Sequence, residues 1–283
     1  MKNLKRKDVS KKSMDKKDIR RKFTNVQPND ENKTLLQIKN VIKEFKNGND
    51  LTRILNGINL EIYKGDFTVI MGPSGSGKST LMYCISGMDK VTDGEVLYNG
   101  ECISKYNEKK VAKLRSGEFG FVFQQMHLVS NLNLFENVAV PGYLNKGKSN
   151  EEVNERAEEL FVSVNLKERM KHLPSQVSGG EQQRAAIARA MINSPKLLFA
   201  DEPTGALNRK NTEEVLKLFT QINRDGQSIL MVTHDIRVAV RATRIIYLED
   251  GQVVGELNLE PYDDNTEKER EAKINYWLTS LSW

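Results

Sequence analysis

Two shortages limit what this 283-residue chain can be. Cys84 and Cys102 are its only cysteines, too few for a disulfide scaffold, and Cys84 is expected to be a small core residue in a reducing compartment. No apolar run approaches the roughly 20 residues of a membrane-spanning helix, and no hydrophobic stretch near the start marks a secretory signal. We therefore expect a soluble chain that would rely on another chain for any membrane span.

The part expected to fold also lacks a net positive charge. The net charge is +5, but residues 1–33 hold twelve Lys/Arg against five Asp/Glu, so the remaining residues are net negative. This distribution argues against a nucleic-acid footprint. Residues 1–33 are predicted to be a disordered basic tail, because they hold too few apolar residues to offset the entropy of ordering. Weak attraction to an anionic membrane surface is an alternative role for this tail.

A glycine-rich loop is the most informative feature present. An apolar, β-branched run at 67–71 predicts a buried strand, and residues 81–86 predict a helix that Gly87 ends. Between them lies the pattern G-x-x-x-x-G-K-[ST], which in this context predicts a phosphate-binding P-loop. Its residues are Gly72, Pro73, Ser74, Gly75, Ser76, Gly77, Lys78, Ser79 and Thr80.

The chemistry of this loop follows from its residue types. Its three glycines can take positive φ, so that backbone N–H groups surround an anion at the start of a helix. Lys78 is expected to reach the β- and γ-phosphates, and the Ser79 hydroxyl to bind Mg²⁺. Thr80 is expected to cap the helix or to contact the α-phosphate side.

A second anion site is predicted at Ser178, Gly179, Gly180 and Glu181, before an alanine-rich helix. Ser178 and Glu181 have the spacing of a capping box, so a well-capped helix is enough to explain that pair. Such a cap does not require two adjacent glycines, which bare the backbone N–H groups at the helix N-terminus.

Polar residues follow two further buried strands. The run at 197–200 leads into Asp201 and Glu202, at the strand end where open α/β sheets bind ligands. Asp201 is expected to hold Mg²⁺, and Glu202 to orient or deprotonate a water molecule. The strand at 228–233 ends at His234, which suits contact with a γ-phosphate or the water, although lone histidines are more often structural.

Phe45 ends an earlier strand and is either an adenine-stacking ring or a core residue.

The remaining pattern predicts an α/β fold with a mostly helical insert at about 131–190. Further strands are predicted at 35–41, 43–45, 54–62, 94–100, 119–123, 244–248 and 252–257. Further helices are predicted at 108–115, 151–161, 211–224 and 267–283.

Taken in order, these motifs resemble the ATP-binding subunit of an ABC transporter. The P-loop, Gln124 after a strand, the 178–182 signature, the acidic pair and His234 occur in the family's order, and the match covers about residues 34–258. Residues 177–184 and 201–207 are most similar to the branch of macrolide-efflux, lipoprotein-release and antimicrobial-peptide, lantibiotic or bacitracin-resistance ATPases. The tryptophans of the C-terminal helix resemble the peptide-antibiotic members most.

The resemblance implies a P-loop ABC-type ATPase domain over 34–258, with an antiparallel β subdomain, a helical subdomain at about 131–190 and a C-terminal extension at 259–283. It implies ATP and Mg²⁺ as ligands, Gln124 as a metal contact and hinge, and Lys78, Gln124, Glu202 and His234 as catalytic residues. It also implies a head-to-tail homodimer in which each ATP lies between one P-loop and the partner's 178–181 segment.

The resemblance further implies a membrane-spanning permease as partner, docked near residues 135–141, and a place on the cytoplasmic face of the cell membrane, with no nucleic acid bound. The function expected is to power transport, with export of or resistance to a peptide antibiotic or similar amphiphile. Sensing or mechanical signalling through a membrane partner is the alternative. One departure is Asn208, where the family usually has aspartate at a position that communicates across the dimer.

Overall fold

The computed structural model describes residues 34–48, 50–145 and 147–281. The basic tail predicted at 1–33 and the last two residues of the predicted C-terminal helix lie outside these residues. The strands are β1 (Thr34–Asn47), β2 (Asp50–Tyr63), β3 (Phe67–Met71), β4 (Asp93–Tyr98), β5 (Glu101–Cys102), β6 (Phe119–Phe123), β7 (Leu197–Asp201), β8 (Ser228–Val232), β9 (Arg244–Glu249) and β10 (Gln252–Asn258). The α-helices are α2 (Lys78–Ile85), α3 (Glu108–Gly117), α4 (Leu134–Tyr143), α5 (Asn150–Ser163), α6 (Gly179–Met191), α7 (Arg209–Arg224), α8 (Ile236–Ala239) and α9 (Glu267–Ser280).

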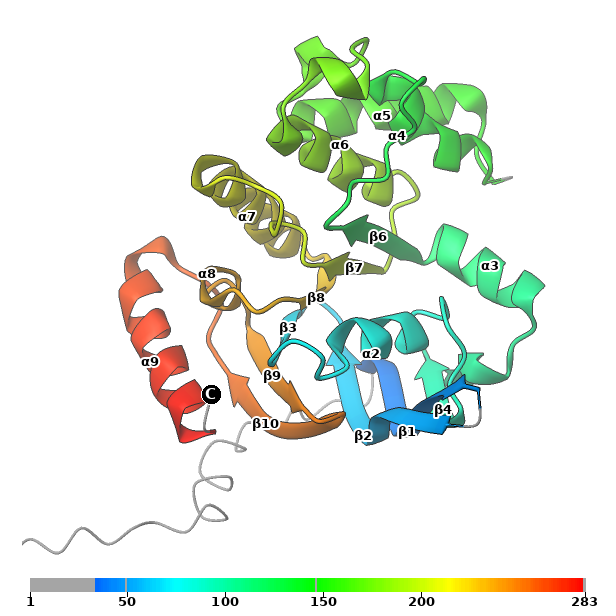
Figure 1. Cartoon of the computed structure of the whole chain (residues 1–283). Helices are drawn as coiled ribbons and strands as arrows, with labels where there is room; N and C mark the ends of the chain where they lie inside the picture. The colour runs from blue at the N-terminus through cyan, green and yellow to red at the C-terminus, as the bar shows by residue number, and fades with distance from the viewer. Residues whose placement is uncertain (1–33, 49, 146, 282–283) are drawn as a thin grey trace, which may run out of the picture.

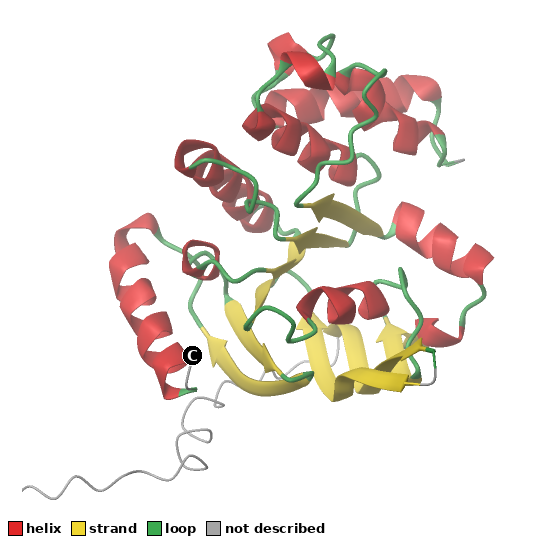
Figure 2. Cartoon of the chain, viewed as in Figure 1, coloured by secondary structure: helices red, strands yellow, loops and turns green. Residues whose placement is uncertain are grey.

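Two β-sheets form the body of the molecule (Figures 1 and 2). Within the described residues, one sheet has the order β2-β1-β4-β5 and is antiparallel. The other has the order β10-β9-β3-β8-β7-β6, with parallel pairing from β9 to β6 and an antiparallel β10 at its edge. This α/β fold with an antiparallel subdomain confirms the predicted fold class.

The larger sheet is covered on both faces. Every residue of β3 and of β8 is buried, as expected for central strands of a parallel sheet. One apolar core lies between this sheet, α2 and the antiparallel sheet, and it includes Leu81, Cys84 and Ile246. The other lies on the opposite face under α7, α8 and α9. The P-loop helix α2 is therefore packed between the two sheets (Figure 1).

Helices α4, α5 and α6 pack around a third apolar cluster, which includes Val138, Phe161 and Ile192. They lie beyond the β6 edge of the larger sheet, at the top of Figure 1. The ring of Phe135 stacks on Phe161 at a centroid distance of 6.3 Å. Val140, Tyr143 and Leu144, at the end of α4, leave large apolar side chains exposed.

The C-terminal helix α9 is tied to the short helix α8, which follows His234 in the chain. Arg270 is buried, and its guanidinium donates hydrogen bonds to the carbonyl oxygens of Val240, Ala242 and Glu260. The ring of Trp277 lies edge-on to Tyr247 of β9. Helix α9 therefore supports the segment that carries His234.

Replacing Arg270 with methionine should lower the free energy of unfolding by about 2–4 kcal/mol, because buried carbonyl oxygens lose their donors while the aliphatic packing remains. Urea titration followed by circular dichroism measures this loss. Lys273→Met is the control, because Lys273 is exposed on the same helix. Equal midpoints for the two variants would contradict the anchoring role.

Candidate functional site

The P-loop has the backbone geometry predicted for an anion-binding loop. Its glycines Gly72, Gly75 and Gly77 have φ values of +152°, +82° and +98°. A Cβ on Gly72 would lie 1.9 Å from the carbonyl oxygen of Leu248, so no larger residue fits there. The loop leads directly into Lys78, the first residue of α2, and the backbone N–H groups at this helix start are favourable for phosphate.

Lys78 is folded back onto the loop. Its side chain is buried, with 7% of the residue exposed, and Nζ donates hydrogen bonds to the carbonyl oxygens of Gly72 at 2.9 Å and Pro73 at 2.8 Å. Burial lowers the pKa of Lys78, and the nearby carboxylates of Glu202 and Asp201 act against that shift. The ammonium group is therefore held inside the loop with weak neutral acceptors, which a phosphate could replace.

Ser79 and Asp201 meet at the carboxyl end of β7. The Ser79 hydroxyl donates to Asp201 Oδ1 at 3.0 Å. A hydroxyl and a carboxylate are the hard oxygen ligands that Mg²⁺ prefers, and Mg²⁺ usually takes its other ligands from water and phosphates. In the described part of the chain, no three His, Cys, Asp or Glu residues cluster as a metal site. The pair thus fits a magnesium ion shared with a nucleotide.

Sequence reasoning missed Tyr83, whose hydroxyl donates to the other oxygen of Asp201, Oδ2, at 2.8 Å. The available signal was spacing, because Tyr83 follows Ser79 by one helical turn and therefore shares its face of α2. Burial and the hydrogen bond to Asp201 raise the pKa of Tyr83 to about 12. The phenol therefore stays protonated, and remains a donor, throughout the physiological range.

Glu202 and His234 lie together, since their strands β7 and β8 are neighbours. The atoms His234 Nδ1 and Glu202 Oε1 are 3.1 Å apart. Glu202 has a φ of +42°, and its backbone N–H donates to Val232 O at 3.0 Å. A pocket of about 380 Å³ opens here, lined by Ile54, Ser74, Gly75, Gly77, Lys78, Ser79, Thr80 and Glu202.

Gln124 lies outside this pocket lining. The residue is exposed, and its side chain lies over Gly205, where an added Cβ would be 2.8 Å from Gln124 Nε2. Helix α6 holds the backbone on either side of it. The Gln183 amide donates to Phe123 O at 3.1 Å, and Arg189 donates to the carbonyl oxygens at positions 126 and 127.

Phe45 is not an ordinary core residue, since 45% of it is exposed. The Lys43 ammonium lies 4.7 Å from the centroid of its ring. An exposed ring near the end of β1 is available for stacking on a planar ligand.

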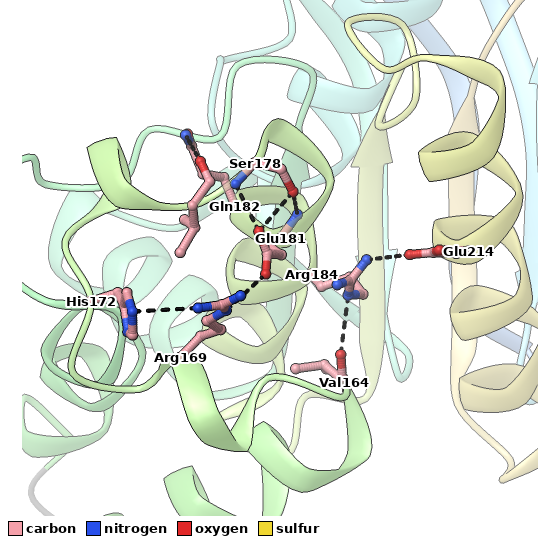
Figure 3. Close-up of polar contacts among 9 residues, drawn as sticks. Val164, Arg169, His172, Ser178, Glu181, Gln182, Arg184 and Glu214 are labelled. Carbon is pink, nitrogen blue, oxygen red and sulfur yellow. Dashed lines mark hydrogen bonds and ion pairs between the residues drawn. The ribbon is translucent and has the colours of Figure 1, made fainter.

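The predicted second anion site begins α6, in the helical region, and contributes nothing to the described lining of the P-loop pocket. Ser178 caps the helix: its Oγ accepts from the Glu181 N–H at 3.3 Å and donates to Glu181 Oε2 at 2.8 Å. The Ser178 N–H also donates to Oε2, so the capping box is confirmed. Figure 3 shows that Arg169 approaches the same carboxylate from the other side, with Nε 3.2 Å from Oε1. The hydrogen bond from the Ser178 backbone, more than any other contact, lowers the pKa of Glu181.

The two glycines of this segment are under different constraints. A Cβ on Gly180 would lie 2.5 Å from Asn211 Cγ of α7, whereas one on Gly179 would have its nearest neighbour 3.7 Å away, at Leu207. Gly180 is therefore required by the packing of α6 on α7, which sequence reasoning did not foresee.

Asn208 has a local structural role as well, because its side chain caps α7 by accepting from the Asn211 N–H at 3.0 Å.

A buried strand, a positive-φ glycine loop, a lysine inside that loop and a carboxylate facing the loop serine define a P-loop nucleoside triphosphatase. The family described as "ABC transporter" matches residues 55–205, and the chain belongs to this family. It is an ATP-binding cassette of the ATPase type.

Relatives agree with this membership. The chain is 44% identical over 220 residues to YknY, an uncharacterized ABC transporter ATP-binding protein of Bacillus subtilis, covering 78% of this chain and 95% of YknY. It is 46% identical over 221 residues to the macrolide export ATP-binding/permease protein MacB of Wolinella succinogenes, covering 78% of this chain and 34% of MacB. The chain thus spans about a third of the length of the MacB relatives it matches.

A solved structure of the ATP-binding cassette MJ0796, in a dimeric post-hydrolysis state bound to ADP and Pi, is similar with a TM-score of 0.74 and 41% identity. The likeness covers 81% of this chain and all of that one. Over its described residues, this chain has no helix with the length and apolarity needed to cross a bilayer.

Gly180→Ala should lower the free energy of unfolding by about 1–3 kcal/mol, because its methyl group would collide with Asn211 and force α6 and α7 apart. Gly179→Ala is the matched control and should be neutral or slightly stabilising, because its methyl group would meet Leu207 only at an ordinary van der Waals distance. Thermal unfolding of both variants separates the cases. Equal stability of the two variants would contradict the packing role of Gly180.

Proposed function

We propose that this chain is the ATP-hydrolysing subunit that powers a membrane ABC transporter. The observation that carries the proposal is that five residues meet at the carboxyl ends of the central strands of the larger sheet. They are Lys78, Ser79, Asp201, Glu202 and His234. Between them these residues offer a cation for phosphate, oxygen ligands for Mg²⁺ and a carboxylate for water. This is the set of groups that phosphoryl transfer to water requires.

In this proposal the P-loop residues 72–80 bind the phosphates through backbone N–H groups and Lys78, and the exposed Phe45 ring stacks on adenine. Ser79 and Asp201 hold Mg²⁺, which when bound neutralises phosphate charge. Gln124 joins the metal site after its side chain leaves Gly205, and the grip of α6 on the flanking backbone supports its role as a hinge.

Glu202 is the residue proposed to orient or deprotonate the attacking water. Its side chain is partly exposed to the pocket, so a water molecule can reach it. The His234 ring, which follows β8 in the chain, places Nδ1 3.1 Å from Glu202 Oε1 and gives the carboxylate a polar partner. A carboxylate held in place near a bound phosphate is suited to general-base assistance.

The signature segment supports a head-to-tail homodimer. A single chain holds two anion-binding helix starts, at the P-loop and at Ser178, and the described P-loop pocket is lined by residues of the first alone. Two copies facing each other would bring Ser178, Gly179, Gly180 and Glu181 of one to the γ-phosphate on the other. The MJ0796 cassette is dimeric in its ADP- and Pi-bound state, which supports the same assembly here.

The proposed partner is a membrane-spanning permease, and the proposed place is the cytoplasmic face of the cell membrane. The docking surface around residues 135–141 is supported by the exposed apolar side chains of Val140, Tyr143 and Leu144.

MacB relatives are named for macrolide export, which supports export of an amphiphilic compound. A peptide antibiotic is the substrate class we favour, because the C-terminal helix resembles that of the peptide-antibiotic members.

Lys78→Ala should weaken ATP binding by about tenfold to a hundredfold, because a charge-assisted phosphate contact is lost. Calorimetric titration with ATP measures the affinity directly. Lys64→Ala is the control, since Lys64 is exposed before β3 and lies outside the pocket lining. An affinity equal to that of the control would refute the phosphate role of Lys78.

Glu202→Gln should still bind ATP but hydrolyse it about 10²- to 10⁴-fold more slowly, because the amide cannot accept a proton from water. ATP-bound dimers should then accumulate, which phosphate release and size-exclusion chromatography detect together. Glu158→Gln, on the exposed face of α5, should behave like the parent. Parental turnover in Glu202→Gln would exclude Glu202 as the base.

A further inference from the structure

Asp201 accepts hydrogen bonds on both of its carboxylate oxygens, and the two donors come from one face of α2. The Ser79 hydroxyl binds Oδ1 at 3.0 Å and the Tyr83 hydroxyl binds Oδ2 at 2.8 Å. The proposed function uses Ser79 and Asp201 but leaves Tyr83 without a role. We infer that Tyr83 is a positioning residue, which holds the Asp201 carboxylate in the orientation that Mg²⁺ binding requires. The inference rests on the proposed function.

The two hydrogen bonds act on different oxygens of the same carboxylate. A serine hydroxyl has one proton and two lone pairs, so Ser79 can offer a lone pair to the ion while it still donates to Asp201 Oδ1. A carboxylate held by that single bond could rotate about its Cβ–Cγ bond. The Tyr83 hydroxyl lies one turn further along α2 and holds the opposite oxygen. Ser79 and Tyr83 together therefore fix the orientation of the Asp201 carboxylate.

Burial and chemistry both suit Tyr83 to this role. Its ring packs against the apolar core between α2 and the antiparallel sheet, so the hydroxyl is carried by a side chain with little freedom. The phenol has one proton to donate, and Asp201 Oδ2 accepts it. Partners that orient a metal-binding carboxylate in this way commonly change metal affinity by about 10- to 100-fold when they are removed.

Tyr83→Phe removes the hydroxyl and leaves the ring packing in place, so it separates the positioning role from the core role. The probe is the non-hydrolysable analogue AMP-PNP, titrated calorimetrically against the full chain in EDTA and at a series of Mg²⁺ concentrations. The variant should need about tenfold more Mg²⁺ for the half-maximal gain in affinity. In EDTA, its affinity for AMP-PNP should equal that of the parent, because no Mg²⁺ is present for Asp201 to bind.

Tyr98→Phe is the matched control. The Tyr98 hydroxyl donates to Glu118 Oε2 at 2.6 Å, and neither residue lines the P-loop pocket, so its loss removes the same kind of bond elsewhere. This control should keep the parent's Mg²⁺ dependence. Thermal unfolding of both variants verifies that they are folded.

Two results would overturn the inference while leaving the proposed function intact. One is a Tyr83→Phe variant whose Mg²⁺ curve superimposes on that of the parent. The other is an equal loss of AMP-PNP affinity with and without Mg²⁺, which would show that the hydroxyl only stabilises the pocket. A parent chain that bound no AMP-PNP at all would instead overturn the proposed function, and the inference with it.

Discussion

The site depends on the register of three neighbouring parallel strands. Ile70 of β3 pairs with Val232 of β8, and Val232 pairs with Asp201 of β7. The carboxyl ends of these three strands are therefore level with one another. The next N–H groups continue this pairing, from Thr233 to Ile70 O and from Glu202 to Val232 O. A slip of one residue would turn every side chain of the slipped strand to the opposite face of the sheet. The P-loop, the acidic pair and His234 meet because this register holds.

Much of the fold could be predicted because its central strands are short, apolar and followed by polar residues of known chemistry. The strands at 67–71 and 119–123 have the predicted bounds, since buried parallel strands are continuous apolar runs. The positive φ angles of the P-loop glycines were also predictable, because only glycine adopts them without strain. The meeting of Ser79 with Asp201, over a hundred residues apart, was predictable only because the motif names both residues.

Contacts between motifs were harder to foresee. Tyr83 belongs to no pattern, and its bond to Asp201 depends on how α2 packs against β7. The clash that keeps Gly180 a glycine comes from Asn211, on another helix. Gln124 was expected near the metal, but here it lies over Gly205, because a side chain in a loop is placed by its neighbours. Such details follow from three-dimensional packing, which a linear pattern does not encode.

The contacts between α6 and residues 123–127 have a mechanical consequence. Gln183 and Arg189, six residues apart on one helix, grip backbone carbonyl oxygens on both sides of Gln124. The backbone around Gln124 is therefore attached to α6 at two points, one at Phe123, the last residue of β6, and the other in the loop at positions 126 and 127. A displacement of α6 relative to the larger sheet would therefore act on the end of β6 and on this loop together.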